Sequence, residues 1–184
     1  IQPGDAGQRF TLKAPQNFNF GFDVVDELAN RDPSALALLH VDSEGLDRRF
    51  TFGDIRDQSA RIANLLGRLG LEKGDKALLI MRRCHQYWPV SVALCKLGAA
   101  MIPATAQLSA HDISYRCNAA SVKMIICAND SSVLASVEQA LPDCPTVSTL
   151  LLAGGSRAGW LDLSQMALCE SPAFLRPLGA QATK

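Results

Sequence analysis

Ala77-Leu78-Leu79-Ile80-Met81 begins the stretch that decides the fold, which continues through a segment at 87–97 and ends in Ala99-Ala100-Met101-Ile102-Pro103. The first and last pieces are short apolar runs without alternation, which is typical of strands covered on both faces of a sheet. The segment between them has Pro89 in its first turn, where a helix tolerates proline, and is followed by Gly98. We therefore expect a buried strand, a helix and a second buried strand.

The same order of elements continues toward the C-terminus. Apolar runs recur at 122–127 and 148–152. Helix-length segments separate the runs: one opens on an S-x-x-D cap formed by Ser109 and Asp112, and the other opens on Ser131. A final short helix is expected at 161–168. Short strand–helix–strand connections produce parallel pairing through right-handed crossovers. The prediction is an α/β fold with a mainly parallel sheet and helices on both of its faces.

Before this sheet, the sequence predicts a helix, a β-hairpin and a long helix. Apolar residues at 22–29 have helical spacing, and Pro33 stops that helix. Runs at 35–41 and 48–52 are bounded by turn formers and predict the hairpin. Thr51 can then cap a helix with Asp54 as a shortened capping-box partner, and an apolar stripe that includes Ile62 and Leu66 faces a core.

We divide the chain into a polar N-terminal arm at 1–16, an α/β unit at 17–171 and a tail at 172–184. The first residue is Ile1 rather than Met, so we expect a piece of a longer protein.

Composition excludes several classes of protein. The 184 residues contain 18 Lys and Arg against 18 Asp and Glu, so we expect no nucleic-acid partner. No apolar run is long enough for a membrane span, and no charged-then-apolar segment opens the chain. The six cysteines have no C-x-x-C spacing. Cys95, Cys117 and Cys127 lie among apolar neighbours and are expected to be buried thiols in a reduced compartment, although an even count also allows a disulfide framework. We therefore expect a cytoplasmic protein.

A search for self-contained catalytic motifs finds none. The glycine-containing stretch 153–159 has P-loop spacing, but Trp160 occupies the position of the lysine, so we interpret the stretch as a flexible surface turn. His40, His85 and His111 are scattered, and no metal-ligand spacing occurs. Arg82-Arg83 follow a predicted strand, where α/β sheets bind ligands, although two solvated arginines in a loop are the simpler interpretation.

Several stretches together resemble the acyl-adenylate-forming superfamily, with the closest likeness to medium-chain acyl-CoA synthetases. The similarity extends over roughly residues 17–168, and its most specific part is the run at 102–116. The stretches that carry the resemblance are Phe18-Asn19-Phe20, Asp23-Val24-Val25-Asp26, Phe50-Thr51-Phe52-Gly53-Asp54-Ile55, Ala60-Arg61-Ile62-Ala63-Asn64-Leu65-Leu66, Gly70-Leu71-Glu72-Lys73-Gly74-Asp75, Lys96-Leu97-Gly98-Ala99 and Ile102-Pro103-Ala104-Thr105-Ala106-Gln107-Leu108-Ser109-Ala110-His111-Asp112-Ile113-Ser114-Tyr115-Arg116.

The resemblance implies a parent ligase that uses ATP, Mg²⁺, a small carboxylate and CoA. The acid first forms an acyl-adenylate with release of pyrophosphate, and the CoA thiol then displaces AMP. The family's phosphate loop and C-terminal lysine are absent from this sequence, so we expect the chain to be the N-terminal subdomain, inactive alone and without tight binding of these ligands. The acyl substrate and the oligomeric state stay open. A stand-alone, non-catalytic binding or interaction module with the same fold is the alternative.

Gln107 is the one candidate binding residue. It lies in a loop that leaves the carboxyl end of the predicted strand at 99–103, and its amide offers both a donor and an acceptor. The resemblance implies a Pro-x-Thr-x-Gln run whose glutamine contacts CoA. A glutamine that satisfies loop backbone groups is the structural alternative. No catalytic residue and no metal ligand is expected in this chain.

Overall fold

A computed structural model describes residues 15–82, 84–178 and 183 of the chain. The expected N-terminal arm therefore lies almost wholly outside the described residues. In chain order the elements are η1 (Gly21–Asp26, a π-helix), α1 (Glu27–Arg31), β1 (Leu36–Val41), β2 (Asp47–Thr51), α2 (Phe52–Arg68), β3 (Lys76–Ile80), α3 (Tyr87–Leu97), β4 (Ala100–Pro103), α4 (Ala110–Ala120), β5 (Met124–Ala128), α5 (Ser131–Ala140), η2 (Leu141–Asp143, a 3₁₀-helix), β6 (Thr149–Ala153), β7 (Leu161–Asp162) and α6 (Leu163–Leu168).

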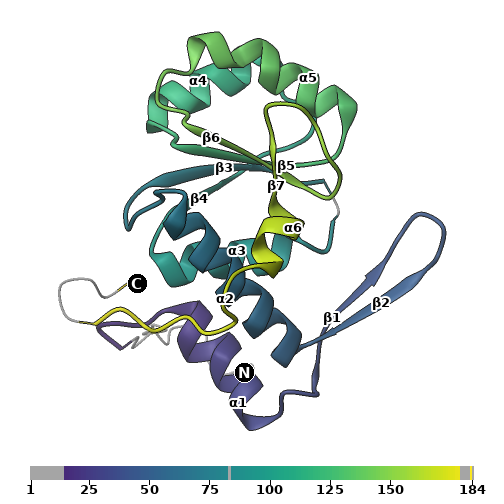
Figure 1. Ribbon diagram of the computed structural model, residues 1–184, viewed down its shortest axis with the longest axis vertical. Coiled ribbons are helices and arrows are strands. Elements are labelled where there is room, and N and C mark those ends of the chain that lie inside the picture. Colours follow the sequence, from purple (N-terminus) through teal and green to yellow (C-terminus); the bar gives the residue numbers. More distant parts are fainter. Residues whose placement is uncertain (1–14, 83, 179–182, 184) are drawn as a thin grey trace, which may run out of the picture.

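The central sheet confirms the predicted α/β class. Its strand order is β4-β3-β5-β6-β7, and every neighbouring pair is parallel. Figure 1 shows α4 and α5 on one face and α2, α3 and α6 on the other. A separate antiparallel hairpin, β1–β2, projects away from the sheet, as expected for the runs at 35–41 and 48–52. None of the described helices is long and apolar enough to cross a membrane.

Two strands differ from the prediction. β4 is at the edge of the sheet and is half-exposed rather than buried, since only β3 pairs with it. Pro103 at its end is compatible with an edge position, where the missing N–H leaves no ladder partner unsatisfied. The expected helix at 161–168 starts with the two-residue strand β7, which is too short to produce a periodic signal.

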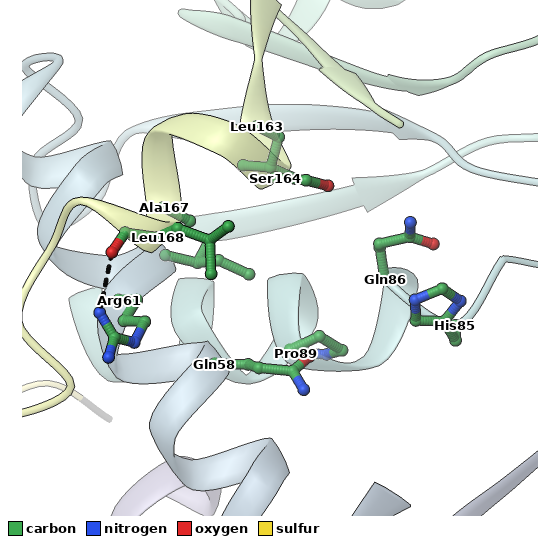
Figure 2. A pocket seen from close by; sticks show the side chains of 10 residues that line it. Gln58, Arg61, His85, Gln86, Pro89, Leu163, Ser164, Ala167 and Leu168 are labelled. Atoms are coloured by element: carbon green, nitrogen blue, oxygen red, sulfur yellow. Dashed lines mark hydrogen bonds between the residues drawn. The ribbon is translucent and has the colours of Figure 1, made fainter. Parts of the chain in front are cut away.

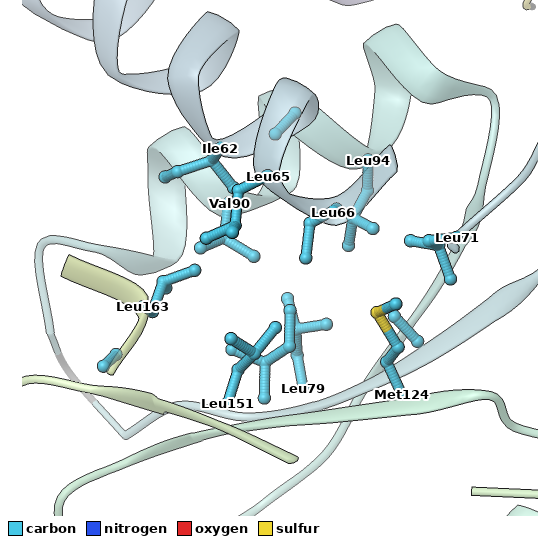
Figure 3. Packing of buried hydrophobic residues seen from close by; sticks show 14 of the residues in the cluster. Ile62, Leu65, Leu66, Leu71, Leu79, Val90, Leu94, Met124, Leu151 and Leu163 are labelled. Carbon is cyan, nitrogen blue, oxygen red and sulfur yellow. The ribbon is translucent and has the colours of Figure 1, made fainter. Parts of the chain in front are cut away.

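The apolar strands supply two cores. Successive side chains of a strand point to opposite faces, so one continuous apolar run serves both. Leu79, Ile126 and Leu151 face α2, α3 and α6, where they meet Ile62, Leu66 and their neighbours (Figure 3). On the other face, alternate residues of the same strands pack beneath α4 and α5; they are Leu78, Ile80, Ile125, Cys127 and Leu152.

Both predicted helix caps are present. Asp54 N donates to Thr51 Oγ1 at 3.1 Å, while Thr51 N donates to Asp54 Oδ2 at 2.8 Å. Ser109 and Asp112 repeat this reciprocal arrangement at the start of α4. Each box satisfies donors that a helix start leaves without partners. Gly98 follows the C-terminal end of α3 with φ +70°, the left-handed conformation that ends the helix.

A buried ion pair between Asp26 and Lys96 anchors η1 to α3. Lys96 is only 1% exposed, and its Nζ lies 2.8 Å from Asp26 Oδ1. The Phe22 ring centroid lies 5.7 Å from the same ammonium. Burial raises the pKa of Asp26 and lowers the pKa of Lys96, because both charges have lost part of their hydration. Charge pairing then opposes both shifts.

The segment 169–178, here called the C-terminal strap, runs along α2. Asn64 Nδ2 donates to the carbonyls of Ser171 at 2.9 Å and Ala173 at 3.0 Å. Arg68 Nε lies 2.6 Å from Glu170 Oε1. At the far end of the strap, Arg176 Nη2 donates to Asp23 Oδ2 at 2.9 Å. The strap therefore joins α2 to η1.

Replacing Leu66 by alanine tests the larger core. Leu66 is fully buried between α2 and the sheet, so Leu66→Ala should lower the free energy of unfolding by about 2–5 kcal/mol in urea melts. Leu175→Ala, at a side chain that is 89% exposed, is the matched control and should change little. A loss below about 0.5 kcal/mol at Leu66 would contradict the packing of α2.

Single and double substitutions test the buried Asp26–Lys96 pair. Lys96→Met leaves the Asp26 carboxylate without its cation and should cost about 3–5 kcal/mol, whereas Asp26→Leu combined with Lys96→Met should recover most of that loss. Arg31→Met, which removes the exposed pair with Glu27, should cost less than about 0.5 kcal/mol. Additive losses at positions 26 and 96 in denaturant melts would contradict a coupled buried pair.

Candidate functional site

The order of the strands places a crevice at the carboxyl edge of the sheet. β3 and β5 are neighbours, but β3 connects onward through α3 on one face and β5 connects through α5 on the other. The loops that follow these two strands therefore separate. In open α/β sheets this topological switch point is where ligands bind.

Gln107 lines a polar cavity of about 440 Å³ on this edge. The lining residues come from the loops after β3, β4 and β5; they are Arg82, Ala104, Thr105, Ala106, Gln107, Asp130 and Ser132. We call this cavity the polar crevice. Gln107 is exposed, and its backbone N–H donates to Thr105 Oγ1 at 3.3 Å. Within the described part of the chain its side-chain amide has no hydrogen-bond partner, so the amide is available to a ligand.

Asp130 and Arg82 set the charge of the polar crevice. Asp130 accepts hydrogen bonds from Ser132 Oγ at 2.6 Å and Ser132 N at 3.0 Å, and thereby caps α5. The bonds from Ser132 and Val133, with a smaller contribution from Arg82, lower the pKa of Asp130. Arg82 is exposed at the end of β3, as its place in the sequence predicted. Its neighbour Arg83 lies outside the described residues.

The glycine-containing turn after β6 packs beside the β5–α5 loop. Gly155 has φ +93°, and a Cβ there would lie 2.4 Å from Asn129 Nδ2. Arg157 donates to both carboxylate oxygens of Glu138 at 2.6 Å, and Trp160 Nε1 donates to the same carboxylate at 3.0 Å. These bonds lower the pKa of Glu138 to about 2. The turn is thus fastened to α5, which its composition did not indicate.

A second cavity lies on the opposite face of the sheet, between α2, α3 and α6. It has a volume of about 230 Å³ and is mostly apolar. Its lining residues are Gln58, Arg61, Ile62, His85, Gln86, Pro89, Leu163, Ser164, Ala167 and Leu168, and Figure 2 shows them. We call it the apolar cavity. The sequence did not reveal it, because its walls come from three separate segments, at 58–62, 85–89 and 163–168, and the last is more than 70 residues from the other two.

Two of the three histidines, scattered in sequence, meet beside this cavity. His85 stacks on Phe50 with ring centroids 4.9 Å apart and lies edge-on to His40 at 5.6 Å. Burial, followed by the nearby Arg48 and His40, lowers the pKa of His85. His111 is exposed at the start of α4. No group of three metal-ligating side chains occurs among the residues that the structure describes.

Comparison with known families decides the assignment. A model of the AMP-binding enzyme family matches residues 25–173, a range that includes every residue lining the polar crevice and the apolar cavity. The chain belongs to the AMP-binding enzyme family. This finding confirms the resemblance that the sequence motifs carry.

Individual relatives agree with this family. The mitochondrial acyl-coenzyme A synthetase ACSM5 of Mus musculus is 34% identical over 165 residues, covering 86% of this chain and 28% of that protein. Human mitochondrial acyl-coenzyme A synthetase ACSM4 is 32% identical over 169 residues, or 88% of this chain and 29% of that protein. The chain thus spans less than a third of the length of these relatives.

Solved structures support the fold. The fatty acyl CoA synthetase of Mycobacterium tuberculosis superposes with a TM-score of 0.71 at 22% identity, covering 84% of this chain and 29% of that structure. The acyl-CoA synthetase of Brucella canis gives a TM-score of 0.70 at 19% identity, covering 85% of this chain and 28% of that structure.

The expected cytoplasmic location is wrong. The matching relatives from mouse and human are mitochondrial acyl-coenzyme A synthetases, which point to the mitochondrion instead. The expectation rested on free cysteines and on the lack of a secretory-type segment. Both features argue against an oxidising compartment, but neither distinguishes the cytosol from a reducing organelle.

Proposed function

We propose that this chain is the N-terminal part of a mitochondrial acid–thiol ligase that converts a small carboxylate, ATP and CoA into an acyl-CoA, AMP and pyrophosphate. The family match over residues 25–173 carries this proposal. The names of the relatives, which are acyl-coenzyme A synthetases, support the reaction class.

In this reaction the polar crevice would serve the thioester-forming step. CoA combines an amide-containing pantetheine arm with several phosphates, so its site needs both neutral hydrogen-bonding groups and cations. The free amide of Gln107 supplies the first and the exposed guanidinium of Arg82 supplies the second. Ala104 and Ala106 are small, so they leave room for a ligand to approach the loop. We propose that Gln107 contacts the pantetheine arm.

The adenylate-forming step has no equivalent support in these residues. A triphosphate requires clustered backbone N–H donors and a lysine, and the family's phosphate loop is absent from the 184-residue sequence. The described residues also lack a carboxylate cluster suited to Mg²⁺. The residues present here therefore do not fit a magnesium–nucleotide site, and we propose that the chain alone does not adenylate acids.

Pyrophosphate exchange tests directly whether the chain alone adenylates acids. With butyrate, hexanoate or benzoate as the acid, the 184-residue chain should exchange labelled pyrophosphate into ATP at the background rate. The physical reason is the missing anchor for the triphosphate. A rate that increases in proportion to protein and survives repurification would contradict the proposal.

Gln107→Ala tests the CoA contact in the complete parent enzyme. A hydrogen bond to a neutral partner contributes about 0.5–1.5 kcal/mol, so the KM for CoA should rise several-fold while the adenylation half-reaction is nearly unchanged. Gln165→Ala, at an exposed glutamine of α6 outside both cavities, is the matched control. An unchanged KM for CoA, or an equal loss in both half-reactions, would make Gln107 a structural residue.

A further inference from the structure

We propose that the outer face of the β1–β2 hairpin is a docking surface for an apolar segment from the rest of the parent polypeptide. The proposal rests on the function proposed above, in which this chain is part of a longer ligase. It adds the place where the remainder makes contact. Three observations carry it: the register of the two strands, the exposure of their side chains and the small size of the face.

The register separates an inner from an outer face of the hairpin. Phe50 lies on the inner face, because it packs against the small core formed by η1, α2 and α3. Successive side chains of a strand alternate between faces, and directly paired residues share one. Arg49 is therefore on the outer face together with its partner Leu39, and the pair formed by Val41 and Asp47 lies beside them.

The outer face is apolar and uncovered. Leu36 joins it by pairing with Thr51, and the side chains of Leu36, Leu39 and Val41 are 50%, 45% and 54% exposed. None of the three belongs to a buried cluster of the described residues. A hairpin with one face in water normally alternates apolar and polar side chains. β1 instead presents apolar side chains to both faces, which is the pattern of a strand that is covered on both.

The hairpin also lacks a third strand. Figure 1 shows it projecting from the body of the molecule, and β1 and β2 pair only with each other among the described strands. A sheet of two strands is marginally stable in water until a further strand or a packed layer supports it. Exposed apolar strands also attract other chains, so natural proteins cover or interrupt them. Both requirements call for a partner on this face.

The size of the face argues against a second copy of the chain. β1 has six residues, so at about 3.4 Å per residue the hairpin is about 20 Å long. Two strands about 4.8 Å apart make a strip about 10 Å wide, so the face offers roughly 200 Å². A stable complex of separate chains buries about 800 Å² on each partner.

A segment of the same polypeptide needs no such area, because its tether gives it a high effective concentration. This chain spans less than a third of the length of its mitochondrial relatives, so the parent has ample chain to supply that segment. Arg49 is exposed on the outer face and forms no ion pair with any residue that the structure describes. The segment should therefore be apolar and carry a carboxylate opposite Arg49.

Hydrogen–deuterium exchange of the parent enzyme and of the 184-residue chain tests the docking. We expect backbone amides at 36–51 to exchange at least about tenfold more slowly in the parent, because a covered hairpin opens less often. Amides of α4, whose packing is complete in this chain, should exchange equally in both proteins. Equal exchange of the hairpin in the two proteins would overturn the proposal.

Substitutions identify the face that is covered. Leu39→Thr combined with Val41→Thr keeps the β propensity of the strand but removes its apolar surface. In the parent this variant should raise hairpin exchange at least about fivefold, and in the 184-residue chain it should change exchange less than about twofold. Tyr115→Gln, at a side chain of α4 that is 68% exposed, is the control and should have no effect in either protein. An equal increase in both proteins would mean that the strand itself was weakened and would overturn the proposal.

Three further outcomes are decisive. Arg49→Glu should also raise hairpin exchange in the parent, and no change would exclude the carboxylate partner. A dimer of the 184-residue chain in sedimentation that the double threonine variant abolishes would assign the face to a second copy and overturn the proposal. Synthesis of acyl-CoA by the parent is measured on the same samples: its absence with a protected hairpin would contradict the proposed reaction alone, and its presence with an unprotected hairpin would contradict the docking alone.

Discussion

The structure depends on burying both faces of one parallel sheet. β3 and β5 have no solvent-facing side, so each must present apolar side chains in both directions and each needs helices above and below. The chain satisfies this requirement by sending successive crossovers to different faces, with α3 on one and α4 and α5 on the other. The reversal between β3 and β5 then opens the polar crevice, so the candidate site is a direct consequence of how the core is covered.

Local sequence signals were sufficient for most of this architecture. The runs at 77–81 and 122–127 predicted strands because continuous apolar residues can only be accommodated between two layers. Thr51 and Ser109 predicted helix starts because the reciprocal cap is formed within four residues. Gln107 could be placed at the carboxyl edge for a similar reason, since the strand and helix that flank its loop were both recognisable.

The features that the sequence did not predict depend on contacts between residues far apart in the chain, which the spacing of residue types does not encode. Lys96 occurs in an otherwise apolar helix, and nothing near it in sequence indicates that Asp26 is its partner. The Glu138–Arg157–Trp160 contact likewise became visible only when α5 and the turn after β6 were placed together. The edge position of β4 was missed because half-burial and full burial produce the same short apolar run. The apolar cavity was missed because no single segment forms it.

The way in which α2 holds the strap has a consequence for sequence variation. Asn64 contacts the strap through the main-chain carbonyls of Ser171 and Ala173, and Arg61 does so through that of Glu170, beside its bond to the carbonyl of Leu168 at the end of α6. Every amino acid carries the same carbonyl, so these contacts fix the path of the strap without specifying its side chains. Homologous chains can therefore vary at 171 and 173 and keep the course of the strap, provided that the two polar residues on α2 and the side-chain contacts of Glu170 and Arg176 persist.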